Sequence, residues 1–242
     1  MILNSSNLKF TVGSIYLVLI IIGLYFLFSA IDIKDLTSYE FIKSNKDIIL
    51  KYKNENFLFL VIIFFIFAII WVLLLGFATP LLLFAGFVFG KWWGILIVLT
   101  STTIGATLLY LLAKLFFKDI IEKKFAVKFY KLKKYFSKND FFYFMFFRFI
   151  GGGGTPYAIQ NILPVLFDMS AKNYFFATLV GCTPSMFITV AFGDGLENVI
   201  DKSEDLNIFY IINSPDIYLP IIGFAIILII AFFAKRFYFP QN

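Results

Sequence analysis

A charged stretch that breaks the backbone interrupts an otherwise apolar part of this sequence. It reads FRFIGGGGTP over residues 147–156, so an arginine, four glycines and a proline stand where hydrocarbon-facing helix is expected. The planar guanidinium of Arg148 matches a phosphate group better than a lysine ammonium does. The glycines release backbone N–H and C=O groups and let another backbone or a ligand come close. Half-helix ends that meet at such a break supply partial charges for an ion or a headgroup.

The residues around this break and a second Thr-Pro break form the candidate site. Pro156 suits the first turn of a new helix. The amides of Gln160 and Asn161 can hydrogen-bond a headgroup or, more commonly, the broken backbone of an opposing hairpin. For Arg148 two interpretations stay open, namely ligand contact, and snorkelling or pairing with carbonyls. The predicted substrate-binding residues are Arg148, Gly151, Gly152, Gly153, Gly154, Thr155, Pro156, Gln160, Asn161, Thr79 and Pro80, and Asp168 is a candidate proton carrier.

The composition excludes several kinds of chemistry. The chain has no histidine and a single cysteine, Cys182, which rules out internal disulfides, Cys/His zinc sites and Ser-His catalysis. No acid pair or nucleophile–base pair is visible, so we predict no catalytic residues, no metal, no cofactor and no enzymatic activity. The net charge of +6 in a chain that is 61% hydrophobic indicates membrane topology and attraction to anionic lipid, not nucleic-acid binding.

Membrane helices must position these residues. Apolar runs at 10–31, 95–117, 171–192 and 217–234 are long enough to span, and the first is too long for a cleavable signal. The basic segment 118–140 is expected in the cytoplasm and the acidic segment 194–216 outside. Residues 57–91 and 141–168 must then dip in and return. The predicted fold is an all-α polytopic membrane protein with about four transmembrane helices and two opposed re-entrant hairpins that form an inverted repeat.

The repeat rests on matching positions that lie 76 residues apart. These are Thr79-Pro80 with Thr155-Pro156, Gly105 with Gly181, and Gly76 with Gly152. Broken apolar segments at corresponding positions of two inverted units indicate a transporter-like site at the membrane midplane. The alternative is that the two Thr-Pro pairs merely kink two helices.

Three regions follow from this topology. Residues 1–56 form an anchor helix with a polar segment, residues 57–195 form the hairpin-containing domain, and residues 196–242 form an outer acidic loop and a last transmembrane helix. Between the hairpins, residues 118–138 place apolar side chains on one helical face with lysines around the rest. This basic amphipathic helix either lies on an anionic inner leaflet or packs on the bundle as a linker.

Two longer stretches resemble a known family. The first is ATPLLLFAGFVFGKWWGILIVLTSTTIGATLLYLLAK and the second is FMFFRFIGGGGTPYAIQNILPVLFDMSAKNYFFATLVGCTPSMFITVAFG. They are similar to the two halves of the VTT domain of the DedA / SNARE-associated Golgi protein superfamily. The motif positions of that domain fall on Arg148, Pro156, Asn161, Gly181, Pro184 and Gly193. The first hairpin lacks the acid typical of the bacterial DedA branch, and the glycines replace a usual proline, so the chain looks closer to the Tvp-like branch.

The resemblance implies a protein that moves lipids between leaflets. We expect a flippase or scramblase that holds a phosphate-bearing headgroup in a polar notch between the hairpins. Alternatives are a secondary transporter of a small anion and a non-transporting membrane interaction protein. The expected partners are membrane lipids, including anionic inner-leaflet headgroups at the basic helix. The expected location is the bacterial inner membrane, with both termini cytoplasmic.

Overall fold

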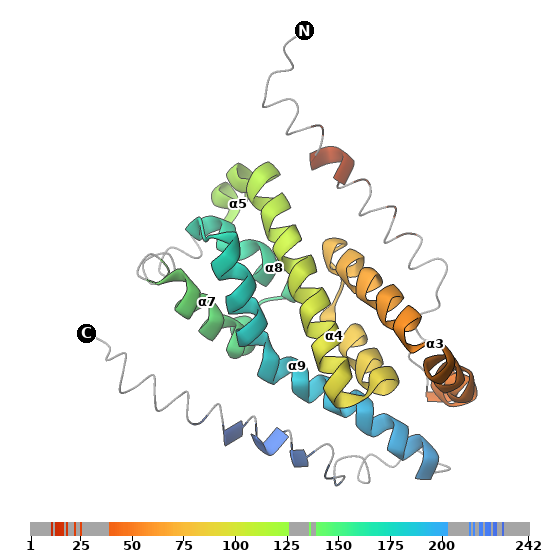
Figure 1. The fold of residues 1–242 in the computed structure, drawn as a ribbon. Coiled ribbons are helices and arrows are strands. Elements are labelled where there is room, and N and C mark those ends of the chain that lie inside the picture. Colours follow the sequence, from red (N-terminus) through yellow and green to blue (C-terminus); the bar gives the residue numbers. More distant parts are fainter. Residues whose placement is uncertain are drawn as a thin grey trace.

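The computed structural model describes residues 39–125, 136 and 139–202, with single residues or short groups between 11 and 25 and between 213 and 229. Every regular element of the described residues between 39 and 202 is a helix, which confirms the all-α prediction for them (Figure 1). In order they are α3 (Tyr39–Leu73), α4 (Ala78–Phe116), α5 (Lys118–Phe125), α7 (Asp140–Phe149), η1 (Gly151–Gly154), α8 (Tyr157–Ile162), η2 (Leu163–Phe167) and α9 (Ala171–Lys202).

Three described helices have the length and composition to cross a membrane: Lys51–Leu73, Ala78–Phe116 and Ala171–Gly195. The second covers the predicted span 95–117 except its last residue and the third contains the predicted span 171–192, while the predicted spans 10–31 and 217–234 lie largely outside the described residues. The first extends back to residue 51, before the apolar run 57–77 that was predicted only to dip into the bilayer. Asn56 has non-helical backbone angles (φ −137°, ψ 42°) and divides α3 there, so the unbroken helix 57–73 is about 26 Å long, at the lower limit for a full span.

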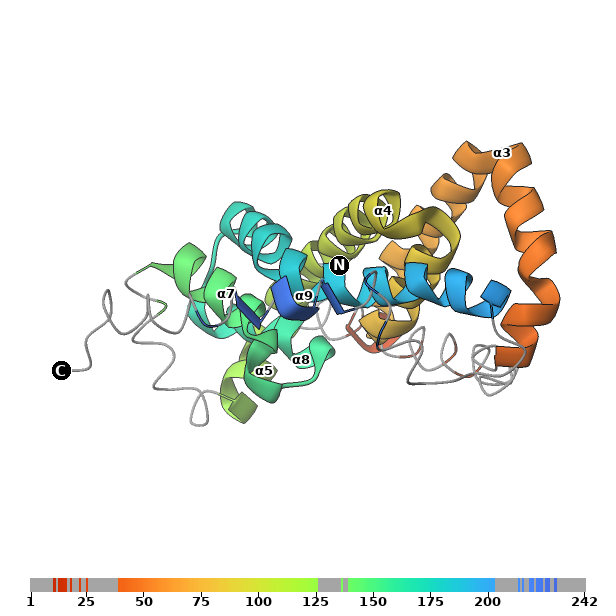
Figure 2. The ribbon, with the colours of Figure 1, turned by 90° about the horizontal axis from the view of Figure 1, so that it is seen from below.

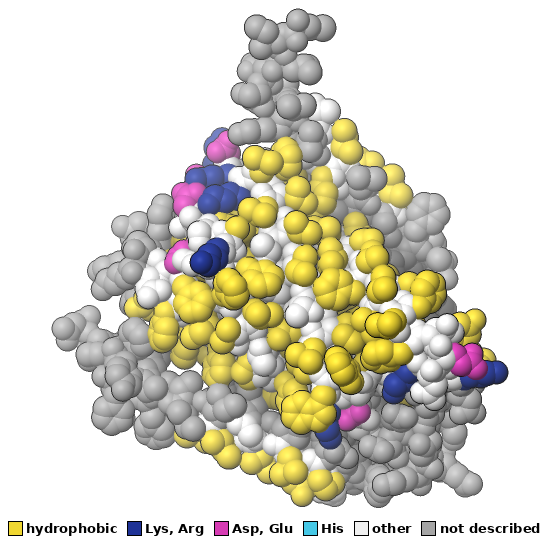
Figure 3. Space-filling view, in the orientation of Figure 1, with side chains coloured by type: hydrophobic (Ala, Val, Ile, Leu, Met, Phe, Trp, Pro, Cys, Tyr) yellow, Lys and Arg dark blue, Asp and Glu magenta, His cyan; other side chains and the backbone are white. Residues whose placement is uncertain are grey.

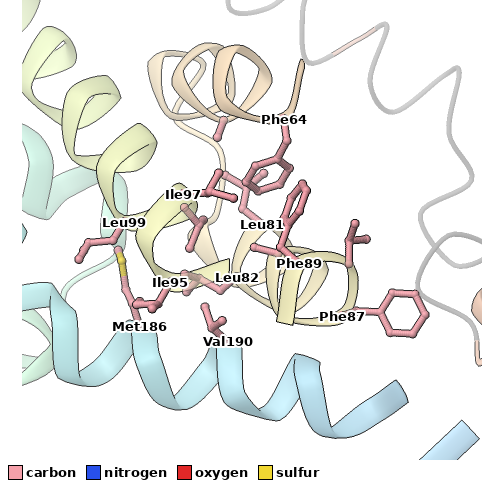
Figure 4. Packing of buried hydrophobic residues seen from close by; sticks show 14 of the residues in the cluster. Phe64, Leu81, Leu82, Phe87, Phe89, Ile95, Ile97, Leu99, Met186 and Val190 are labelled. Atoms are coloured by element: carbon pink, nitrogen blue, oxygen red, sulfur yellow. The ribbon is translucent and has the colours of Figure 1, made fainter. Parts of the chain in front are cut away.

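The first predicted hairpin folds back on itself nevertheless. Gly90 has φ +76°, a conformation that favours glycine, and it divides α4 into a short first limb and a long second limb. The ring of Phe57, near the start of the apolar part of α3, lies 6.0 Å from the ring of Phe89 and 6.3 Å from Trp93. Residues 57–90 therefore leave one end of the molecule and return to it. Figure 4 shows side chains of both limbs, such as Leu82 and Ile95, packed together against α9.

The second predicted hairpin also returns to its starting end. At the first residue of α7, Asp140 Oδ1 accepts a 2.8 Å hydrogen bond from Asn173 Nδ2 in the first turn of α9. The chain between them runs through α7, η1, α8 and η2. Helix α7 begins after Asn139, whose side chain accepts a hydrogen bond from the backbone N–H of Phe142. With only 10 residues, α7 is about 15 Å long and too short to cross a bilayer.

Helix contacts recur at the predicted offset of 76 residues. A Cβ atom added to Gly105 would lie 3.0 Å from the Ile69 carbonyl oxygen and 3.0 Å from Val72 Cβ, where α4 meets α3. A Cβ atom added to Gly181 would lie 2.5 Å from the Met145 carbonyl oxygen and 2.7 Å from Arg148 Cβ, where α9 meets α7. Both residues of α7 lie 76 positions after their counterparts in α3. Figures 1 and 2 show the matching placement, with α3 and α7 on opposite sides of the central helices α4 and α9.

Ion pairs join the central helices at both ends. Lys91 Nζ lies 3.6 Å from Asp194 Oδ2, whereas at the other end Lys118 Nζ lies 2.7 Å and Lys114 Nζ 3.8 Å from Asp168 Oδ1. The second limb of α4 and helix α9 are therefore antiparallel, in agreement with the predicted topology. The hydrogen bond that Lys118 donates to Asp168 raises the pKa of Lys118. Figure 3 shows charged side chains at opposite margins of one face, with hydrophobic side chains between them.

Two predicted segments differ in detail. The acidic segment was expected to form a loop from Asp194 onward, but α9 continues to Lys202, so Asp194 lies within a helix. In the basic segment 118–138 the side chains of Ile121 and Phe136 are buried, and the Phe136 ring stacks 4.1 Å from that of Phe167. At these two positions the apolar face packs on the protein, as the second alternative required. Residues 126–135 lie outside the described part.

Candidate functional site

Arg148 is buried inside the protein. It lies in the last turn of α7 and is only 1% exposed, so its side chain does not snorkel to the surface. The close approach of α9 at Gly181 presses that helix against the Cβ of Arg148. The side chain thus lies between α7, the start of α8 and the first half of α9.

Three neutral oxygen atoms accept hydrogen bonds from the Arg148 guanidinium. Nη1 donates to Gln160 Oε1 at 3.3 Å, and Nη2 donates to Asn161 Oδ1 at 2.5 Å and to the Tyr174 hydroxyl at 2.9 Å. The Tyr174 hydroxyl in turn donates to the Asn161 carbonyl oxygen at 3.2 Å, which holds α9 against α8. We call Arg148, Gln160, Asn161 and Tyr174 the arginine cluster.

Aromatic rings enclose the same guanidinium. Its Cζ atom lies 4.9 Å from the centre of the Phe144 ring, 5.6 Å from that of Tyr157 and 5.8 Å from that of Tyr174. Tyr174 also stacks between Phe144, at 5.1 Å, and Tyr110 of α4, at 4.6 Å. Ring faces attract a cation and exclude water, so the cluster is a low-dielectric surrounding for one positive charge.

The charge of Arg148 has no counter-ion among the described residues. No carboxylate lies within ion-pair distance in this part of the chain, and the Nε atom has no hydrogen-bond partner there. A buried cation without an anion costs several kcal/mol, which amides and ring faces offset only in part. The cluster is therefore suited to receive one anion.

Gln160 connects the arginine cluster to the glycine run. Its Nε2 atom donates to the carbonyl oxygens of Thr155 at 2.7 Å and Gly151 at 3.2 Å. Gly151 and Gly152 have φ values of +71° and +69°, and a Cβ atom added to Gly152 would lie 2.1 Å from Gln160 Cδ. Thr155 Oγ1 donates to the Gly152 carbonyl at 2.6 Å. The backbone groups of the run were predicted to be free, but these side chains bind the carbonyl oxygens of Gly151 and Gly152.

The predicted residues separate into two groups. Arg148, Gln160 and Asn161 come together, with Gly151, Gly152 and Thr155 held beside them through Gln160, and Gly153 and Gly154 complete η1. Gln160 bonds the backbone of its own hairpin, not of the opposite one as predicted. Pro156 is exposed at the start of α8.

The remaining predicted residues lie apart from the arginine cluster. Thr79 and Pro80 are exposed in the first turn of α4, and none of the hydrogen bonds or ring contacts of Arg148 among the described residues reaches them. Asp168 is exposed and paired with Lys114 and Lys118. Its assignment as a proton carrier stays a prediction.

Tyr174, Phe144 and Tyr157 were not among the residues predicted from the sequence. The periodicity of an α-helix could have predicted Phe144 and Tyr174. Phe144 is four residues before Arg148, and Tyr174 is seven residues before Gly181, so each shares a helix face with a residue already selected. Their aromatic character was hidden because phenylalanine and tyrosine are abundant throughout this chain.

Comparison with known proteins identifies a domain family and relatives of this chain. Residues 77–195 match the VTT domain family, which lies within the predicted domain 57–195. Over 159 residues the chain is 27% identical to a protein named Transmembrane protein 41 homolog from Caenorhabditis elegans. This alignment covers 63% of the present chain and 63% of the length of that relative. No solved structure matches the chain. Neither match distinguishes the Tvp-like branch, which stays a prediction.

Proposed function

We propose that this chain, whose residues 77–195 match the VTT domain family, works as a member of that family and translocates lipids between leaflets. The arginine cluster would bind the phosphate of the headgroup while the acyl chains stay in the bilayer. The observation that carries this proposal is a buried guanidinium whose hydrogen-bond partners are all neutral. A phosphate oxygen would supply the missing negative charge and accept from the unpartnered Nε atom.

Binding requires the cluster to open. With Arg148 only 1% exposed, a headgroup reaches the guanidinium after a neighbouring segment moves away. The segment that we propose to move is η1, where two successive glycines have positive φ and Gln160 bonds the run to the cluster. A phosphate that replaces Gln160 as the acceptor of Nη1 would free the Gln160 side chain to give up its bonds to Gly151 and Thr155. Headgroup binding and opening would thus be coupled.

The orientation within the membrane is also a proposal. We place the end of the molecule with Lys118 and Asp168 in the cytoplasm, and the end with Lys91 and Asp194 outside. The lysine-rich segment 118–140 supports this choice through the positive-inside rule. We also propose that both termini are cytoplasmic and that the membrane is a bacterial inner membrane. The basic segment would then contact anionic headgroups of the inner leaflet.

Reconstitution in vesicles tests the function. The full chain would be compared with Arg148→Lys and with the exposed control Lys51→Gln, using a lipid carrying a fluorescent label on an acyl chain. A lysine keeps the charge but loses the planar fork, so we expect Arg148→Lys to slow lipid movement at least about tenfold while the control is unchanged. Equal rates in Arg148→Lys and the parent would show that Arg148 is not the headgroup ligand. Uptake of a small anion without lipid movement would instead favour the solute-transporter alternative.

Accessibility of introduced cysteines tests the opposed hairpins. Thr79→Cys and Thr155→Cys would be made in a Cys182→Ala background, because Cys182 is the only native cysteine. We expect a membrane-impermeant thiol reagent to reach the two positions from opposite sides of the vesicle. Reaction of both from one side would contradict the inverted arrangement of the two units.

A further inference from the structure

The arginine cluster has the composition of a site for a single negative charge. Arg148 is its only cation, and its partners Gln160, Asn161 and Tyr174 are neutral. The titratable side chains that face the guanidinium are Tyr157 on α8, Tyr174 and Cys182 on α9, and, behind Tyr174, Tyr110 on α4. Phenols and thiols of this kind keep their protons below about pH 8, so the site holds one positive charge throughout the physiological range.

The repeat adds no second charge. Counting back 76 residues, the positions that correspond to Arg148, Gln160, Asn161 and Tyr174 are Val72, Phe84, Ala85 and Val98. All four are apolar, and Val72, Ala85 and Val98 are fully buried. Lys114 and Lys118, beside the end of the second hairpin, are paired with Asp168. One unit of the repeat therefore carries the charge and the other is hydrocarbon-like.

We infer that this site selects lipids with a singly charged phosphate, that is phosphodiester headgroups, over lipids with a doubly charged phosphomonoester. This inference rests on the proposed function, because it names the class of lipid that the same site accepts. A phosphodiester neutralises Arg148 and leaves no net charge in the low-dielectric cluster. A phosphomonoester dianion leaves one uncompensated negative charge among three aromatic rings and two amides, a strongly unfavourable state.

The two classes predict different responses to pH. A phosphodiester carries one charge from acidic to neutral pH, so its rate of movement should change less than about twofold between pH 5 and pH 7. A phosphomonoester has a second pKa of about 6, so its singly charged fraction falls about tenfold over the same interval. We expect the rate for the monoester lipid to fall by a similar factor as pH rises.

The test uses the full chain in vesicles that contain labelled phosphatidylglycerol, a diester, or labelled phosphatidic acid, a monoester. A second measurement records the thermal shift of the detergent-solubilised chain with the dihexanoyl form of each lipid. Slow movement of the monoester at pH 7 that recovers at pH 5, with a larger shift for the diester at pH 7, supports the inference. Equal, pH-independent movement of both lipids would overturn it and leave lipid translocation intact.

The binding measurement separates failure of the inference from failure of the function. If neither lipid moves but the diester alone shifts the melting temperature at pH 7, the proposed function is wrong and the selectivity of the site stands. If neither lipid moves and neither shifts the melting temperature, or the monoester dianion shifts it as much as the diester, the inference is wrong. A variant that removes the site charge, Arg148→Gln, should abolish the shift, whereas Lys51→Gln should keep it.

Discussion

Replacement of Asn161 by aspartate would place a counter-ion beside Arg148 with almost no change of shape. Asn161 is 1% exposed and its Oδ1 atom lies 2.5 Å from Arg148 Nη2, so a carboxylate oxygen in the same position would form a buried ion pair. Two unit charges about 4 Å apart attract by about 4 kcal/mol at an effective dielectric constant of about 20. Desolvation of the new carboxylate, which also costs several kcal/mol, offsets most of this gain. The stability of Asn161→Asp should therefore stay within about 2 kcal/mol of the parent.

The same substitution should have a much larger effect on ligand binding. It lowers the net charge of the arginine cluster from +1 to zero, so an incoming phosphate loses the attraction of about 4 kcal/mol. Because 1.36 kcal/mol corresponds to a factor of ten, that loss would slow lipid movement by up to about a thousandfold. We expect a decrease of at least about a hundredfold in the vesicle assay, without a fall in melting temperature in detergent.

Two matched variants complete this test. Asn161→Leu removes an acceptor from a buried cation and should lower the stability by about 1.5–3 kcal/mol. Asn54→Asp makes the same change of charge at an exposed position of α3 and should leave both stability and transport unaltered. If Asn161→Asp were folded and moved lipid at the parental rate, the unpaired charge of Arg148 would not be what binds the headgroup.

Two further predictions concern the scaffold. Gly181→Ala would bring a Cβ atom to 2.5 Å from the Met145 carbonyl oxygen, so α9 must move away from α7. We expect the free energy of unfolding to fall by about 1–3 kcal/mol. The control Gly223→Ala, where nothing lies within 4 Å of the added atom, should leave it unchanged. Thermal unfolding in detergent would show the difference. Asp168→Asn should lower stability by less than about 1 kcal/mol, an effect that high salt removes. Because Asp168 raises the pKa of Lys118, the stability contributed by the ion pair should be complete below about pH 10 and disappear as Lys118 deprotonates at higher pH. A stability difference between Asp168→Asn and the parent that persists in the alkaline range would contradict the ion pair.

The sequence alone determined the features that depend on local pattern. The recurring apolar runs, long enough to span a bilayer, led to an all-α membrane protein, and the helices confirm this for the described residues between 39 and 202. The second break was located because glycine and proline restrict or release the backbone wherever they stand, and the α-helices are interrupted at 150–156; the first interruption is at 74–77, just before Thr79-Pro80, which belongs to the first turn of α4. Charge distribution indicated that the second limb of α4 and helix α9 run in opposite directions, as their terminal ion pairs require.

Only the tertiary structure decided what each polar side chain meets. No local pattern shows that Tyr174, 26 residues after Arg148, supplies its third acceptor, or that Asp168 pairs with Lys118, 50 residues earlier. Helix α9 also exceeded its expected length, because helix ends depend on the neighbouring helices that bury or pair them. Hydropathy and backbone preference act between residues close in the chain, whereas the partners of a buried charge are set by which helices pack together. For that reason the sequence could select Arg148, but could not show that its charge is buried without a counter-ion among the described residues.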